Sequence, residues 1–185
     1  TTSNNSKVIF LNVLDTKLKV CLIAGSPSAD VSAISKATTN DKNIQLRKII
    51  QTSANKFLND VKISAIDSAD VLFLVDFPAS STPQNLIDKI LSAVNNQNKP
   101  FFILLSNNVN IGRLKLLENF LPFTIENNNT EFIQVLPELN SDLYSSSFST
   151  ANNKKEIWDN LPPVSQAAAK IQIKPGSNTL VSSKV

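Results

Sequence analysis

Small and polar side chains that could bind a ligand follow three apolar segments of this chain. The segments VCLIA, VLFLV and FFILL are continuous and apolar, which is typical of strands buried on both faces of a parallel sheet. The carboxyl ends of such strands meet along one edge, and open α/β folds bind their ligands there. The candidate ligand-binding residues are Gly25, Ser26, Ser28, Asp30, Asp76, Phe77, Ser106 and Asn107.

The turn Gly25-Ser26-Pro27-Ser28 precedes a predicted helix, whose first N–H groups can bind an anion. A phosphate-binding loop normally needs several glycines so that the backbone can approach the ligand. This turn has one glycine and one proline. A simple turn into the helix is therefore the favoured interpretation.

Three carboxylates, Asp30, Asp76 and Asp70, are expected near the same edge of the sheet and could offer oxygen ligands to a hard cation. Their spacing matches no calcium-binding loop. Helix capping and solvation are the favoured roles, so the sequence predicts neither a metal site nor a cofactor.

Ser106 is the candidate nucleophile of these segments. A serine hydroxyl needs an adjacent base, but the chain has no histidine and no recognisable motif places a lysine beside Ser106. A serine at a strand end usually bonds to its own turn. The only cysteine, Cys21, lies within an apolar run and is predicted to be a buried small hydrophobe. We therefore predict no catalytic residue.

Strands and helices alternate in the part of the chain that must position these residues. The expected strands are Lys7–Val13, Lys19–Ala24, Ile44–Gln51, Val71–Val75 and Pro100–Leu105. Helices are expected after the caps Ser28, Thr82 and Asn110, with Pro83 at a first helical position. Phe77 is expected to pack beneath the helix that follows it. This order predicts a three-layer α/β fold, with a mostly parallel sheet and helices on both faces.

The last third of the chain is predicted to add β structure. A hairpin is expected between Phe123–Ile125 and Phe132–Leu136, with the polar segment Glu126–Glu131 as its turn. The remaining expectations are an irregular Ser141–Asn153, a helical turn at Glu156–Leu161 around Trp158, and strands at Ala167–Ile173 and Thr179–Val185 joined by Pro175-Gly176. The fold class is therefore α/β with extra strands at the ends.

Composition limits the possible partners. Only two of the 18 basic residues, Arg47 and Arg113, are arginines, so the net charge of +3 predicts a solvated surface and no nucleic-acid partner. No apolar run is long enough to span a membrane. The chain has no methionine and both ends look cut. Residues 1–185 are therefore interpreted as a single domain excised from a longer protein.

Several segments together resemble the class I glutamine amidotransferase-like fold, in its degenerate branch found in membrane-tethered bacterial proteins of unknown function. They are LKVCLIAGSPSADVSAI, ADVLFLVDFPASSTPQNLIDKI, KPFFILLSNN and IWDNLPPV, and the resemblance covers about Val20 to Val164. It implies a flavodoxin-like arrangement and an extracytoplasmic or membrane-associated location. It also implies that the partners are other domains of the same polypeptide, or further proteins, and that membrane contact comes through segments outside this chain.

Active members of that fold carry a cysteine nucleophile on a glycine-flanked elbow after a strand, and a histidine later in the chain. Here the elbow falls at Ser106-Asn107-Asn108, without cysteine or glycine, and histidine is absent. The resemblance thus implies a non-catalytic binding or assembly module. The alternatives are an amidotransferase or hydrolase that uses Ser106, a small-molecule or carbohydrate sensor with a concave, partly apolar pocket, and a structural spacer.

Overall fold

The computed structural model describes residues 17–58, 62–106, 108–126, 131–140 and 160–184. The predicted strand Lys7–Val13, the segment Ser141–Asn153 and the environment of Trp158 lie outside these residues.

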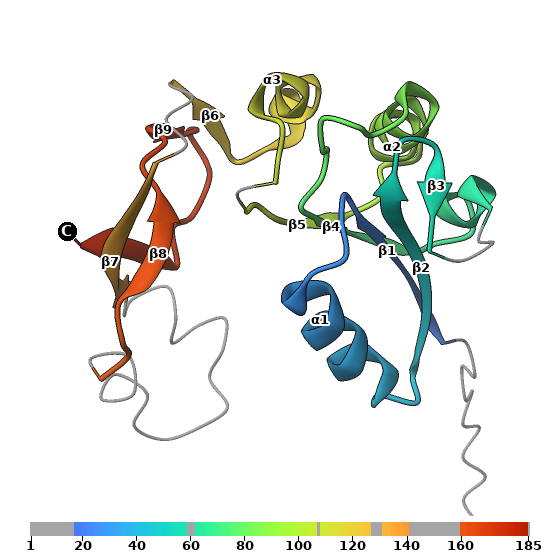
Figure 1. The fold of residues 1–185 in the computed structure, drawn as a ribbon, viewed down its shortest axis with the longest axis horizontal. Helices are drawn as coiled ribbons and strands as arrows, with labels where there is room; N and C mark the ends of the chain where they lie inside the picture. The colour runs from blue at the N-terminus through green and yellow to red at the C-terminus, as the bar shows by residue number, and fades with distance from the viewer. Residues whose placement is uncertain (1–16, 59–61, 107, 127–130, 141–159, 185) are drawn as a thin grey trace, which may run out of the picture.

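A five-stranded sheet forms the centre of the larger lobe, in the order β3-β2-β1-β4-β5 (Figure 1). The strands are β1 (Leu18–Ala24), β2 (Ile44–Ser53), β3 (Lys56–Phe57), β4 (Val71–Val75) and β5 (Phe101–Leu104). All neighbours pair in parallel except β3, which is antiparallel to β2. The continuous apolar runs of β1 and β4 lie in the middle, where both faces of a strand are covered. We call this part the α/β lobe.

Helices cover both faces of this sheet, which confirms the three-layer α/β prediction. On one face, α1 (Ala29–Thr39) packs Val31 against a cluster that includes Leu22 and Val75. The opposite face carries the larger core, beneath α2 and the short helices. These are η1 (Ile63–Ile66), α2 (Gln84–Gln97), α3 (Ile111–Leu114) and η2 (Lys115–Phe120).

Two of the three predicted helix caps are confirmed. The Ser28 hydroxyl accepts a hydrogen bond from Val31 N at 3.3 Å, and Asn110 Oδ1 accepts one from Arg113 N at 3.0 Å. These bonds satisfy first-turn N–H groups that have no partner within the helix.

The predicted Thr82 cap is wrong. The helix begins at Gln84, after Pro83, without a side-chain cap. The buried Thr82 hydroxyl instead donates to Gln51 Oε1 at 3.0 Å and accepts from Ala79 N at 2.9 Å. Gln51 is only 1% exposed, and a buried amide needs hydrogen-bond partners. Because the Thr82 hydroxyl bonds to Gln51 and to Ala79 N, it does not cap the helix.

A second, smaller unit follows η2, and we call it the β-lobe. Its strands are β6 (Phe123–Ile125), β7 (Phe132–Leu139), β8 (Val164–Ala167), β9 (Ile171–Ile173) and β10 (Val181–Lys184). Strand β7 lies between β10 and β8, and β6 pairs with β9, all antiparallel.

The β-lobe corrects two predictions. The hairpin expected between Phe123–Ile125 and Phe132–Leu136 does not form, because β6 and β7 belong to different sheets and each pairs with a later strand. The single strand expected at Ala167–Ile173 is divided between β8 and β9. The prediction of additional β structure after the α/β part is confirmed.

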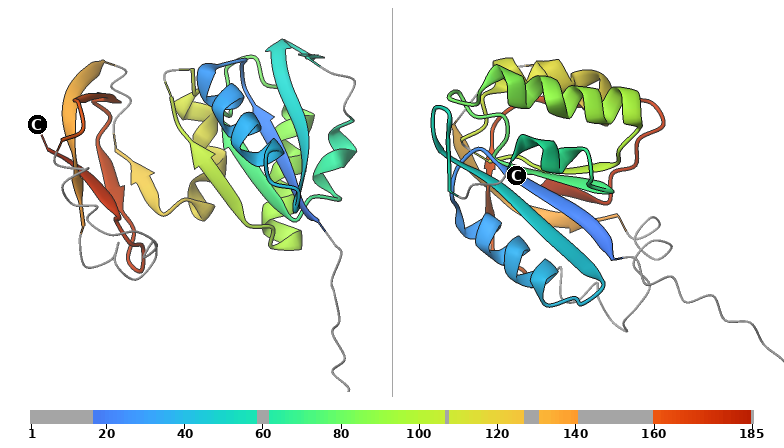
Figure 2. Two further views of the ribbon diagram at one scale, coloured as in Figure 1. Left: turned by 90° about the horizontal axis from the view of Figure 1, so that it is seen from below. Right: turned by 90° about the vertical axis from the view of Figure 1, so that its right-hand side faces the viewer.

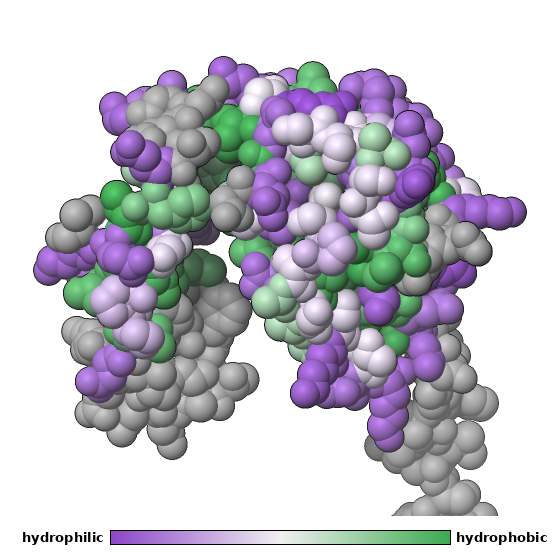
Figure 3. All heavy atoms as spheres, in the orientation of Figure 1, coloured by the Kyte–Doolittle hydropathy of each residue, from purple (hydrophilic) through white to green (hydrophobic). Residues whose placement is uncertain are grey.

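The two lobes lie side by side, with the β-lobe beside the β5 edge of the sheet in Figure 1 and in the left panel of Figure 2. Contacts with the chain just before β6 help to hold the lobes together. Lys174 N donates to Pro122 O at 2.9 Å, and the Lys174 ammonium donates to the Glu118 carbonyl. Figure 3 shows that the surface is hollowed between the lobes and that apolar residues border the hollow.

Candidate functional site

The strand ends meet as expected at the carboxyl edge of the sheet. Strand β1 continues into Gly25, β4 into Asp76, and β5 into Leu105 and Ser106. The chain passes from β1 to β2 on one side and then to β4 on the other, so the direction of winding reverses between β1 and β4. Open α/β sheets place their ligands outside this point. Gly25 N donates to Val75 O at 3.0 Å and joins the two strands there.

Asp76 is the centre of a hydrogen-bonded group at this edge, which we call the strand-end cluster: Ser26, Asp76, Ser106 and Asn108. The Asp76 side chain is 1% exposed, and its carboxylate accepts bonds from the Ser106 hydroxyl and from Ser26 Oγ at 3.4 Å. Asn108 Nδ2 donates to Ser26 Oγ at 3.3 Å, and Asn108 N donates to Ser106 Oγ at 3.4 Å. The cluster therefore joins the ends of β1, β4 and β5.

The backbone at Asp76 has an unusual conformation and lies very close to Gly25. Its φ of 52° lies in the left-handed region, which costs a non-glycine residue free energy but is tolerated best by Asp and Asn. The Asp76 carbonyl also approaches Gly25 so closely that a β-carbon there would lie 2.1 Å from the oxygen. Only glycine fits at position 25, for reasons of space.

The other candidate residues from the sequence lie outside the strand-end cluster. Ser28 caps α1, and Phe77 is 1% exposed within the main core, as expected for a residue beneath the next helix. Asp30 is exposed in the first turn of α1. Asn107 lies outside the described residues. The structure thus brings Gly25, Ser26, Asp76 and Ser106 together but keeps Phe77 away from the surface.

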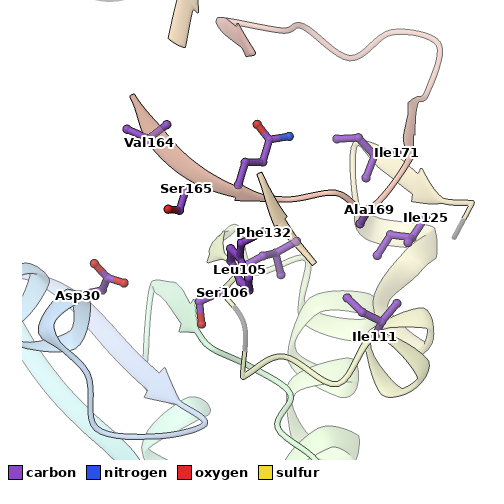
Figure 4. Close-up of a pocket in the computed structure, with 11 residues that line it drawn as sticks. Asp30, Leu105, Ser106, Ile111, Ile125, Phe132, Val164, Ser165, Ala169 and Ile171 are labelled. Atoms are coloured by element: carbon purple, nitrogen blue, oxygen red, sulfur yellow. The ribbon is translucent and has the colours of Figure 1, made fainter. Parts of the chain in front are cut away.

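A cavity of about 550 Å³ lies between the strand ends and the β-lobe (Figure 4). Leu105 and Ser106 contribute from the carboxyl edge of the sheet, Asp30 from the first turn of α1, and Ile111 from α3. The wall on the β-lobe side is formed by Ile125, Phe132, Val164, Ser165, Gln166, Ala169 and Ile171. The strand-end location was predicted, whereas this opposite wall was not, because no local pattern shows that the β-lobe lies there.

A second cavity of about 400 Å³ is lined by residues of the β-lobe. It shares Val164, Gln166 and Ile171 with the first cavity and adds Ile173 and Val181. Half of the large apolar side chains that are exposed among the described residues line one of these two cavities. Apolar exposure concentrated in this way is typical of a binding surface.

Cys21 is separate from both cavities and fully buried in β1, as predicted. Burial raises the pKa of its thiol from 9.0 to about 11. The unfolded chain therefore loses this proton first, so stability is fully present below pH 9 and falls by about 3 kcal/mol as the pH rises to 11. We expect Cys21→Ala to remove this part of the decrease, as measured by urea unfolding between pH 8 and 11. An identical alkaline decrease in both proteins would contradict the assignment.

Comparison with known proteins gives no relative: no family model, curated protein or solved structure matches the chain. Among the described residues, no helix is both long and apolar enough to cross a membrane. The same residues contain no group of three His, Cys, Asp or Glu side chains placed to share a metal ion.

Proposed function

We propose that this chain is a non-catalytic binding domain of the class I glutamine amidotransferase-like type. In this proposal it serves as a binding module of a larger, membrane-anchored bacterial protein, and its ligand occupies the cavity between the strand ends and the β-lobe. The order β2-β1-β4-β5 of the parallel strands supports the flavodoxin-like assignment, because it matches the first four strands of that winding.

The bonding of Ser106 is the observation that carries the non-catalytic part. At the position where the resemblance places a nucleophile, the hydroxyl donates to the buried Asp76 carboxylate and accepts from Asn108 N. The chain has no histidine to move a proton at this position. The hydroxyl therefore serves to connect strand ends, and the cavity beside it is best suited to binding.

The cavity itself supports the binding part. Its volume of about 550 Å³ is in the range of small-molecule sites, which are mostly apolar with a few polar groups. Apolar side chains such as Phe132 and Ile171 stay 48% and 47% exposed there, so the protein alone leaves this surface in contact with water. A ligand that covers them gains hydrophobic free energy.

Titration with Nile red, an uncharged apolar dye, tests the site. We expect saturable binding with one dye per chain, and a dissociation constant about tenfold higher in Phe132→Ser because an aromatic part of the wall is lost. Phe102→Ser is the matched control, since Phe102 is 47% exposed on the sheet and outside both cavities. Absence of saturable binding, or weakening by Phe102→Ser in place of Phe132→Ser, would contradict the proposal.

A second candidate function is hydrolysis with Ser106 as nucleophile. The hydrogen bond from the Ser106 hydroxyl to the Asp76 carboxylate favours hydrolysis, because a carboxylate can act as a general base. However, the Asn108 N–H that lies near Ser106 is directed at Oγ itself, so it does not serve as a donor for the oxyanion of a substrate. Turnover of glutamine or a p-nitrophenyl ester by the native chain, lost in Ser106→Ala, would favour hydrolysis over the binding function.

A further inference from the structure

The walls of the strand-end cavity differ in polarity from one end to the other. Figure 4 shows Asp30 and Ser165, with Val164 beside Ser165, toward the end nearest α1. Ser106 lies near the middle, and the apolar residues Ile111, Ile125, Ala169 and Ile171 lie toward the opposite end. A ligand that satisfies both ends must carry a polar head and an apolar body. A ligand that is polar along its whole length would leave the apolar end without a suitable partner.

Charge at the polar end has one sign. Asp30 is the only charged residue among the described residues that line either cavity. The α1 N-terminus next to it acts as about half a positive charge, so the carboxylate leaves a net negative charge there. This end therefore favours a cation or a hydrogen-bond donor and disfavours an anion.

A second cavity adjoins the first and shares three wall residues with it. Its wall adds the apolar residues Val135, Pro137, Ile173 and Val181 and the polar residues Thr179, Ser182 and Ser183. The Ile173 and Val181 side chains are exposed, at 45% and 38%. A flexible apolar chain can extend from Ile171 into the second cavity and cover these side chains.

We propose that the cavity binds an amphipathic small molecule, with a cationic head beside Asp30 and an apolar chain that runs along Phe132 and Ile171 toward the β-lobe. This inference rests on the proposed binding function and adds the chemical class of the ligand. The proposed ligand is a cation, whereas the net charge of +3 on the whole chain would attract anions.

The preference for a cationic head group is tested by displacing Nile red with three ligands that share a ten-carbon alkyl chain. They are decylammonium, decanol and decanoate, used at pH 7 and each below its micellar concentration. We expect decylammonium to bind about fivefold more tightly than decanol, the effect of one partly exposed ion pair. Decanoate is expected to bind more weakly than both. In Asp30→Asn, the affinity for decylammonium should fall to the affinity for decanol.

Asp88→Asn is the matched control, because it removes the same charge from an exposed position on α2. It should leave the order of the three ligands unchanged. Equal or tighter binding of decanoate, or an unchanged order in Asp30→Asn, would overturn the inference. If Nile red binds but none of the three ligands displaces it, the ligand class is wrong and the binding function stands. If Nile red itself does not bind, the binding function is wrong as well.

Discussion

Gly25→Ala is expected to lower the free energy of unfolding by about 3 kcal/mol, at the upper end of the usual cost of overpacking. The new β-carbon would lie 2.1 Å from the Asp76 carbonyl oxygen and 3.0 Å from the β-carbon of Ala79. The nearest atom belongs to the backbone, so no rotation of a side chain can relieve the contact. The end of β1 must move away from the end of β4, and the bond between Ser26 and Asp76 weakens with it.

Gly112→Ala is the control for this substitution. A β-carbon at Gly112 has its nearest neighbour at 3.4 Å, the Asn110 side-chain oxygen, and the residue lies in α3. Alanine is favoured over glycine within a helix by up to about 1 kcal/mol. Urea unfolding of both variants should give a large loss for position 25 and little change or a gain for position 112. Similar results at the two positions would show that the close approach at Gly25 is not a constraint.

The elements of the α/β lobe were predictable because their signals are local. The run VLFLV forms the buried strand β4, and the apolar stripe from Leu86 to Val94 forms the inner face of α2. Such patterns need only neighbouring residues to be read. Ser28 and Asn110 were equally readable as caps, because a cap bonds to N–H groups two or three residues ahead.

Features that depend on distant partners were not predictable. Thr82 has the right residue type for a cap, but its hydroxyl bonds to Gln51, a residue 31 positions earlier. Strand β6 has three residues, too few for a pattern that selects its partner, and it pairs with β9 across a long separation in sequence. The short polar segment after β6 predicted a hairpin with β7, but the partner of β6 is β9, which comes later in the chain.

Only part of the candidate site was predictable, because local sequence patterns do not show which distant residues come together. Asp76 and Ser106 follow strands β4 and β5, which are neighbours and parallel, so their meeting follows from the sheet order once that order is known. The cavity needs in addition a wall from the β-lobe, including Phe132 and Ile171. Nothing near these residues in the sequence shows that they face the carboxyl edge of the sheet.

Phe77→Ala is expected to cost about 4 kcal/mol of stability, within the usual range for a buried phenylalanine. Phe77 directly follows the strand-end residue Asp76, and its type and place made it a candidate for ligand contact. Its side chain is 1% exposed and belongs to the main core. The substitution therefore removes core contacts and leaves a cavity inside the protein. Urea unfolding measures the loss, and Nile red affinity per folded chain should stay within twofold of the native value.

Phe102→Ala separates this effect from the loss of an aromatic ring as such. Phe102 is 47% exposed, and its ring contacts Phe73 with a centroid distance of 5.5 Å. The loss of one half-exposed aromatic pair should cost about 1 kcal/mol. If Phe77→Ala were as mild as Phe102→Ala but reduced dye binding, Phe77 would have to reach the cavity in solution. A large loss of stability with unchanged binding would instead confine the ligand contacts to the surface that Ser106, Asp30 and the β-lobe enclose.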